Sequence, residues 1–199
     1  MESRPRWFCL IFNNMSFKDK NLDRLGANFD EQKLCDLFKK LQFKVCLCKD
    51  VDKHQMEQIC THFGSKDHSQ YDAFVCIIMS HGTSGDKIMG VDGRTIGIED
   101  LMSEFNAVRC PSLAIKPKIF LVQACRGSEE GELLGPTDDQ QIADNTFSDS
   151  TLSRSRLPKE SDFLLAYGSV PGYVSYRMPN SGSLFIQVSR IMDMIVVRS

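Results

Sequence analysis

Two segments decide the fold of this chain: AFVCIIMSHG at residues 73–82 and KIFLVQACRG at residues 118–127. Each begins with a short apolar run that does not alternate with polar residues, a pattern typical of strands buried on both faces of a parallel sheet. The first run leads into SHG and the second into QACRG. Because ligands bind beyond the carboxyl ends of the strands in open parallel sheets, we expect His81 and Cys125 to emerge at one edge.

Other stretches extend this sheet. Residues 6–12, apolar after Arg6, and residues 163–167 are also short apolar runs, and residues 43–47 alternate apolar with other side chains. These stretches predict further strands. The sequence Val-Asp-Gly at residues 91–93 predicts a hairpin turn.

Capping signals predict two helices between the strands. Asn28 is expected to cap a helix, with Glu31 as its capping-box partner, before apolar residues spaced along one helical face. Asp52 and Gln55 repeat this pattern before a second helix, which we expect to stop near Gly64.

Residues 98–105 and 184–197 have the apolar character of two further helices. Strands and helices thus alternate along the chain. This order predicts the α/β class, with a central, mostly parallel sheet that carries helices on both faces.

Length and composition narrow the class of protein. The chain has 199 residues and a mass of 22.5 kDa, with 42% hydrophobic and 25% charged residues, which is typical of one globular domain with a real core. The net charge of −2 and the pI of about 6.1 provide no basic field that would attract nucleic acid or an anionic membrane. No apolar run approaches the roughly 18 residues of a membrane-spanning helix.

The cysteines indicate a reducing compartment. The first residues lack the long apolar core and cleavage site of a signal peptide, so we expect a cytoplasmic protein. Several cysteines sit within apolar runs, where a free thiol behaves as a small core side chain. The eight are Cys9, Cys35, Cys46, Cys48, Cys60, Cys76, Cys110 and Cys125.

The segment between the second buried strand and residue 161 breaks the pattern. Residues 128–153 contain seven acidic side chains and no lysine or arginine, and they show no apolar periodicity. Such a composition cannot bury enough surface to offset its ordering entropy. We therefore expect residues 1–127 and 161–199 to be structured regions joined by a disordered linker at 128–160.

The two strand ends favour nucleophilic catalysis. A thiol needs a base nearby to form a thiolate, and an imidazole can take that proton and later pass it to a leaving amine. Gly82 lets the backbone approach a substrate closely, and the amides of Gly82 and Cys125 could stabilise an oxyanion. Taken singly, a cysteine or histidine is more often structural. Their joint position at strand ends favours the catalytic interpretation.

Other chemistries fit poorly. Cys46, Cys48, Cys60, His62 and His68 do not form the paired spacing of a zinc site. The chain also lacks the G-x-S-x-G elbow of serine hydrolases and the G-x-G-x-x-G turn of dinucleotide-binding proteins. We expect neither a metal nor another cofactor.

The segment QACRG at residues 123–127 matches a signature of the caspase family, in which a histidine lies about 50 residues before the cysteine. Here the separation is 44 residues. The chain resembles caspases, most of all the apical caspases of the death-receptor branch, although Arg126 stands where that branch more often has glutamine. The resembling segments are FCLIFNN at 8–14, DHSQYDAFVCIIMSHG at 67–82, RCPSLAIKPKIFLVQACRG at 109–127 and DFLLAYGSVPGYVSYR at 162–177.

The resemblance implies a caspase-like (caspase–haemoglobinase) sandwich and an endopeptidase of programmed cell death that cuts after aspartate. It implies these site residues: Cys125 as nucleophile, His81 as acid and base, Gly82 with Cys125 as oxyanion hole, Arg24, Gln123 and Arg177 around the substrate aspartate, and Ser175 and Tyr176 in the adjoining channel. Two forked guanidinium groups suit a carboxylate, and a neutral side chain would leave them unpaired.

The resemblance also gives the acidic linker a role, since caspases are cut after aspartate into large and small subunits. Asp149 is the first candidate, because a small residue, Ser150, follows it in an acidic, structureless context. Asp144 and Asp138 are the next candidates.

Two departures from the family stand out. Leu184 replaces a tryptophan that shapes the outer substrate pocket, so preferences beyond the aspartate are expected to differ. Family members also continue several tens of residues beyond Ser199, with strands that include the one pairing across the dimer. We therefore expect a truncated chain, with protein substrates carrying an exposed aspartate and a weakened homo- or heterodimer. The alternative is a catalytically weak homologue that binds and modulates full-length caspases or adaptors.

Overall fold

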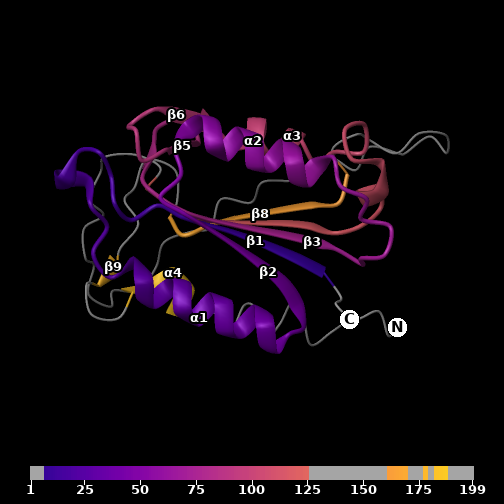
Figure 1. Cartoon of the computed structure of the whole chain (residues 1–199), viewed down its shortest axis with the longest axis horizontal. Coiled ribbons are helices and arrows are strands. Elements are labelled where there is room, and N and C mark those ends of the chain that lie inside the picture. Colours follow the sequence, from indigo (N-terminus) through magenta and orange to yellow (C-terminus); the bar gives the residue numbers. More distant parts are fainter. Residues whose placement is uncertain (1–6, 126–160, 170–176, 179–181, 188–199) are drawn as a thin grey trace, which may run out of the picture.

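The computed structural model describes residues 7–125, 161–169, 177–178 and 182–187. Its centre is a parallel five-stranded sheet in the order β2-β1-β3-β7-β8, with helices on both faces (Figure 1). The predicted α/β class is confirmed. The strands are β1 (Trp7–Asn13), β2 (Phe43–Lys49), β3 (Phe74–Met79), β7 (Lys118–Gln123) and β8 (Phe163–Tyr167).

Smaller elements surround this sheet. An antiparallel three-stranded sheet contains β4 (Gly82–Thr83), β5 (Lys87–Met89) and β6 (Thr95–Gly97), and a hairpin contains β9 (Arg177–Met178) and β10 (Gly182–Ser183). The helices are α1 (Ala27–Lys40), α2 (Lys53–Gly64), α3 (Ile98–Ser103) and α4 (Leu184–Gln187), and η1 (Lys20–Leu22) and η2 (Pro111–Leu113) are 3₁₀ turns.

Alternate residues of the strands face two separate cores. Phe8, Leu10 and Phe12 of β1 join the apolar cluster beneath α2 and α3. Cys9 and Ile11 face the opposite way, into the cluster that α1 and α4 cover. Every residue of β3 and β7 is buried. This explains why their sequences are apolar without alternation, as expected for central parallel strands.

The edge strands differ from the central ones. In β2 only Phe43 is buried, and its other residues are half-buried or exposed, Leu47 among the exposed ones, so the apolar alternation of its sequence is only partly reflected in burial. Across the sheet, β8 is the last strand among the described residues, and Leu164 on it is 45% exposed. The ring of Phe120 on β7 lies 6.0 Å from that of Phe163 on β8. The segment after the acidic linker is therefore packed into the same core as the segment before it.

The first predicted capping box is wrong. Helix α1 is capped by Gly26, whose φ of 81° is left-handed, and Asn28 lies exposed within the first turn. The Glu31 carboxylate instead accepts hydrogen bonds from Asn13 Nδ2 (2.8 Å) and Lys49 Nζ (3.0 Å). Contacts with β1 and β2 therefore outweigh the local capping preference.

The second predicted capping box is confirmed. The Asp52 carboxylate accepts a hydrogen bond from the Gln55 amide (2.8 Å), and the Gln55 side chain accepts one from the Asp52 amide (2.9 Å). Helix α2 ends at Gly64, as the sequence predicted. Of the predicted helix over residues 184–197, α4 covers the first part, and residues 188–199 lie outside the described ranges.

All eight cysteines are free thiols in the structure. In the part of the chain that the structure describes, every helix is too short or too polar to cross a membrane.

The two caps give a direct test of this part of the fold. Replacing Asp52 with alanine removes a side-chain cap and should lower the free energy of unfolding by about 1 kcal/mol. Replacing Asn28 with alanine should lower it by less than about 0.5 kcal/mol, because Asn28 is exposed and caps nothing. Urea denaturation of both variants measures the difference, and equal losses would contradict the assignment.

Candidate active site

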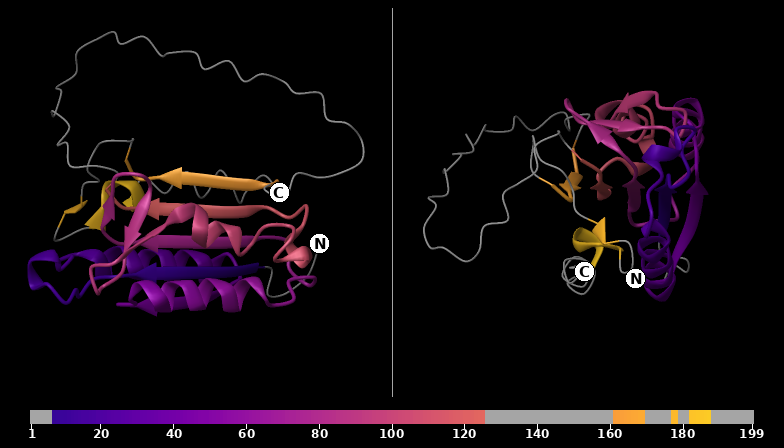
Figure 2. Two further views of the ribbon diagram at one scale, coloured as in Figure 1. Left: turned by 90° about the horizontal axis from the view of Figure 1, so that it is seen from above. Right: turned by 90° about the vertical axis from the view of Figure 1, so that its left-hand side faces the viewer.

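The carboxyl ends of three neighbouring strands meet at one edge of the sheet. Met79, the last residue of β3, lies opposite Asn13 of β1 on one side and Gln123 of β7 on the other. The Ser80 amide continues the ladder by donating to the Gln123 carbonyl (3.3 Å). His81 and Cys125 therefore leave adjacent strands at the same edge, on the side where the arrowheads of the sheet end in Figure 2.

Gly82 lies directly against Cys125. A Cβ atom at position 82 would stand 2.2 Å from the Cys125 carbonyl oxygen and 3.1 Å from the Ala124 Cβ atom. No larger residue fits without a backbone shift, so this close approach requires glycine. The backbone amide of Gly82 and the cysteine thus belong to one small site.

A carbonyl group fixes the imidazole of His81. The Nε2 atom lies 2.8 Å from the Leu22 carbonyl oxygen. A carbonyl only accepts, so Nε2 carries the hydrogen, and in the neutral ring Nδ1 is then the basic nitrogen. The ring of Phe17 packs on the imidazole with the centroids 5.0 Å apart. This orientation suits a group that takes up and returns a proton at Nδ1.

Two carboxylates shape the loop that carries Leu22 and Phe17. Asp23 accepts a hydrogen bond from the Phe17 amide (2.8 Å). Asp50 accepts from the amides of Met15 and Ser16 (2.7 and 2.8 Å). These supports were not predicted from the sequence, because Asp50 is 35 residues from Met15 in the chain.

Arg24 is buried at the same edge, with 2% of its surface exposed. Its Nη1 atom donates to the carbonyl oxygens of Asn14 (2.7 Å) and Met79 (3.0 Å), and it lies 3.4 Å from Asn13 Oδ1. These three acceptors, a side-chain amide oxygen and two backbone carbonyls, orient the guanidinium. Met79, which accepts from Arg24, lies opposite the buried Gln123 in the neighbouring strand β7. The guanidinium of Arg24 therefore lies at the carboxyl ends of β3 and β7. Such a group can receive a carboxylate.

Arg177 reaches this region from a distant part of the chain. Its backbone lies opposite Ser183 in the β9–β10 hairpin. Helix α1 packs against β10, the strand paired with β9, so the backbone of Arg177 lies one strand away from this helix. Other residues singled out from the sequence lie outside the described ranges, namely Ser175, Tyr176, Asp138, Asp144 and Asp149.

Asn14 is a structural residue of the site that the sequence analysis missed. It is fully buried, its Nδ2 atom donates to the Met89 carbonyl (3.2 Å) and Ser80 Oγ (3.4 Å), and its Oδ1 atom accepts from the Val51 amide (2.9 Å). It therefore joins the ends of β1, β3 and β5. The sequence did contain a signal, since Asn13-Asn14 follows the apolar run ending at Phe12 just as Ser80-His81-Gly82 follows the run ending at Met79.

The thiols of the chain differ in their surroundings. Burial raises the pKa of the Cys9, Cys60 and Cys76 thiols, which keeps them protonated. Cys125, in contrast, is only half-buried at the strand-end edge. Along the described ranges, no three or more His, Cys, Asp or Glu side chains are arranged to hold a metal ion.

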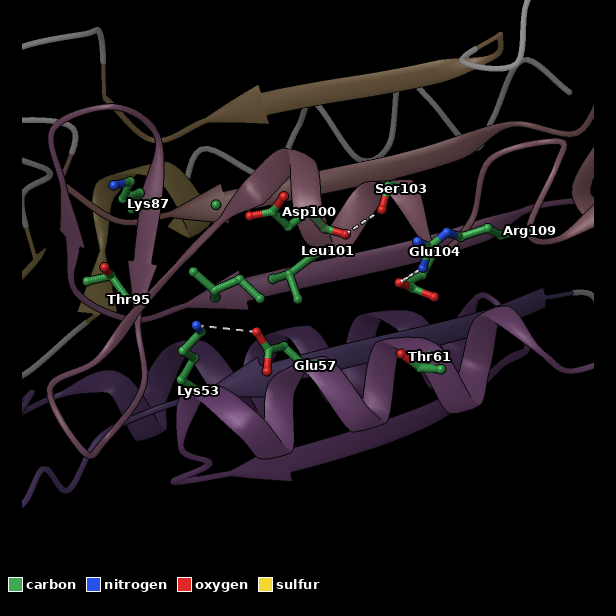
Figure 3. A pocket seen from close by; sticks show the side chains of 12 residues that line it. Lys53, Glu57, Thr61, Lys87, Thr95, Asp100, Leu101, Ser103, Glu104 and Arg109 are labelled. Atoms are coloured by element: carbon green, nitrogen blue, oxygen red, sulfur yellow. Dashed lines mark hydrogen bonds and ion pairs between the residues drawn. The ribbon is translucent and has the colours of Figure 1, made fainter.

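A separate cavity of about 460 Å³ lies between α2, α3 and the small sheet (Figure 3). Charged residues line it, among them Lys53 and Glu57, which form an ion pair at 3.5 Å, and Arg109, which pairs with Glu104. None of the residues predicted to act in catalysis lines it, so it is not part of the strand-end site.

Comparisons with known proteins agree with this geometry. Residues 6–189 match the Caspase domain family. Caspase-8 of Rattus norvegicus is 39% identical over 198 residues, covering 94% of this chain and 41% of that protein. Caspase-3 of Xenopus laevis is 39% identical over 180 residues, covering 90% of this chain and 61% of that protein. The chain thus spans about two fifths to three fifths of the length of these relatives.

A solved structure matches as well. The crystal structure of caspase-1 from Spodoptera frugiperda superposes with a TM-score of 0.78 at 31% identity, covering 94% of this chain and 68% of that one. The caspase-8 relative fits the resemblance to the apical branch. With a family match along nearly its whole length and with Gln123, Ala124 and Cys125 beside Ser80, His81 and Gly82 at the strand-end edge, this chain belongs to the caspase family.

Proposed function

We propose that the chain is the catalytic region of a cysteine endopeptidase that cleaves proteins after aspartate and acts in programmed cell death. One observation carries the proposal. Cys125 and the His81-Gly82 pair leave adjacent strands at the edge where backbone carbonyls orient the buried guanidinium of Arg24. The site thus combines a nucleophile, a base and a cation suited to a carboxylate.

In the proposed mechanism His81 takes the proton of Cys125 at Nδ1. The sulfur then bonds to the substrate carbonyl carbon, and the carbonyl oxygen becomes an oxyanion that the amides of Gly82 and Cys125 stabilise. The peptide C–N bond breaks as His81 gives its proton to the leaving amine. A water molecule, deprotonated by His81, then cleaves the thioester and restores the thiol.

We propose that the aspartate side chain of the substrate binds between Arg24, Gln123 and Arg177. The burial of Arg24 and Gln123 at the strand ends supports this assignment. Ser175 and Tyr176 are proposed to line the adjoining channel, and Leu184 to alter the preference for the residues beyond aspartate. A buried guanidinium gains most from a charged, forked acceptor, which favours aspartate over asparagine.

We further propose a zymogen organisation with a large-subunit-like region at 1–127, a linker at 128–160 and a small-subunit-like region at 161–199. The pairing of β7 with β8 supports it, because the two regions would stay together after the linker is cut. Asp149 is the first proposed processing site, followed by Asp144 and Asp138.

The proposed partners are protein substrates with an exposed aspartate and a second caspase chain. The match to the Caspase domain family supports both partners, and the contact between the two chains is proposed to be weakened, as expected from the sequence. The eight free thiols support a cytoplasmic location. No metal or other cofactor enters the proposal.

Peptide cleavage tests the activity. Three peptides that differ only in ending with Asp, Glu or Asn before a fluorescent reporter should be cleaved with a preference for Asp over Asn of about 10³-fold or more. Cys125→Ala should abolish cleavage, whereas Cys46→Ala, a matched change on the edge strand β2, should retain it. Equal cleavage of all three peptides, or activity that survives Cys125→Ala, would refute the assigned roles.

The arginine pocket has its own test. Arg24→Lys keeps the positive charge but loses the forked donors, so kcat/KM for the Asp peptide should fall about 10- to 100-fold, mostly through KM. Arg94→Lys is the control, since Arg94 is exposed on the β5–β6 turn. An unchanged kcat/KM for Arg24→Lys would exclude Arg24 from substrate binding.

Processing is tested by mass spectrometry of the incubated chain. The proposed order predicts a main cut between Asp149 and Ser150, which Asp149→Ala should remove. A main cut after Asp144 or Asp138 would reassign the site within the linker. Cutting outside residues 128–160 would contradict the proposed organisation.

A further inference from the structure

Asp30 is a buried carboxylate in the first turns of α1, six positions after Arg24 in the sequence. None of its surface is exposed. Both of its oxygens accept from the backbone amide of Ser183, at distances of 3.0 and 2.9 Å. The two residues are 153 positions apart, so this contact joins the region before the linker to the region after it.

The receiving segment is shaped around this carboxylate. Gly182 has a φ of 90°, and a Cβ atom there would stand 2.1 Å from Asp30 Oδ1. Glycine is therefore needed both for the backbone conformation and for the close approach. Ser183 is fully buried, and its hydroxyl accepts from the Ile186 amide (3.3 Å) at the start of α4. Gly182 and Ser183 thus fit Asp30 with little room for adjustment.

Opposing influences act on the buried Asp30 carboxyl group. Burial raises the pKa of Asp30, while hydrogen bonds from Ser183 and the positive charge of Arg24 act in the opposite direction. An apolar residue could pack a helix against a strand without this desolvation cost. A buried carboxylate supplies something an apolar contact does not, which is a directional bond to a particular backbone amide.

The strand pairing carries this bond to the substrate site. Ser183 lies directly opposite Arg177 in the β9–β10 hairpin. By binding the Ser183 amide, Asp30 therefore fixes the position of β10, and β10 pairs with the strand β9 that carries Arg177. Helix α1 begins at Ala27, three residues after Arg24. Its first turns therefore connect to both arginines, to Arg24 through the chain and to Arg177 through Asp30 and Ser183.

We propose that Asp30 is a positioning residue for the aspartate pocket, anchoring Ser183 and strand β10 so that Arg177 on β9 is held in place relative to Arg24. The inference rests on the proposed function, in which these two arginines bind the substrate carboxylate. It adds a residue that is not expected to touch the substrate.

The test compares Asp30→Ala and the isosteric Asp30→Asn with Asp36→Ala, an exposed aspartate on the same helix. Three measurements are made on the full chain: KM and kcat for the Asp peptide, amide hydrogen exchange of residues 182–187, and the rate at which iodoacetamide alkylates Cys125. Iodoacetamide carries no carboxylate, so its reaction reports on the nucleophile without the pocket.

Asp30→Ala should raise KM about tenfold with kcat changed less than about threefold, and exchange at 182–187 should accelerate about tenfold. Asp30→Asn should give intermediate values, because its amide oxygen still accepts one bond. Cys125 alkylation should stay within about twofold of the wild-type rate, and Asp36→Ala should match wild type throughout.

Two results would overturn the inference: unchanged exchange at 182–187 in Asp30→Ala, or a loss of alkylation that parallels the loss of cleavage, as general unfolding would produce. Failure of the proposed function is seen separately, in the wild-type chain. If wild type shows no preference for Asp peptides, the pocket assignment fails, while the exchange data still decide whether Asp30 anchors β10.

Discussion

The in-register parallel pairing of β1, β3 and β7 is the constraint on which the site depends. Asn13, Met79 and Gln123 lie side by side at the ends of these strands, so the residues that follow them emerge at one edge. A slip of one residue in the register would move each side chain of a strand to the opposite face of the sheet. Because both faces of β3 and β7 are buried against helices, such a slip would disrupt two cores at once. The packing that stabilises the sheet therefore also sets the distance between the thiol and the imidazole.

The same edge collects polar groups that would be costly to bury without partners. Asn14 satisfies groups from three strand ends, and the carbonyl of Leu22 holds one nitrogen of His81. The carboxylates of Asp23 and Asp50 in turn accept hydrogen bonds from backbone amides of the loop that leads to Leu22, those of Phe17 and Met15. A buried polar network that is well satisfied is rigid. The imidazole thus depends on a chain of hydrogen bonds that begins well outside the reacting atoms.

Sequence reasoning succeeded where a property is local. The apolar runs gave the strands, and the Asp52–Gln55 box gave the start of α2, because both patterns depend on neighbours in the chain. It failed at Asn28, where Glu31 turns to Asn13 and Lys49 instead of back to the helix end. It also could not single out Asp30, whose partner Ser183 lies 153 residues away. In the sequence the buried Asp30 cannot be distinguished from the exposed Asp36 of the same helix, because only the fold determines which of them is covered.

The contacts across the linker bear on what cutting it can do. The Lys118 amide donates to the Asp162 carbonyl (2.9 Å), β7 pairs with β8 along its length, and Asp30 holds Ser183. Breaking one peptide bond in residues 128–160 removes none of these bonds. The two regions would therefore remain one folded body, and the main change would be in the freedom of the new chain ends. Under the proposed organisation, the sheet that positions Cys125 and His81 would therefore stay intact after the linker is cut.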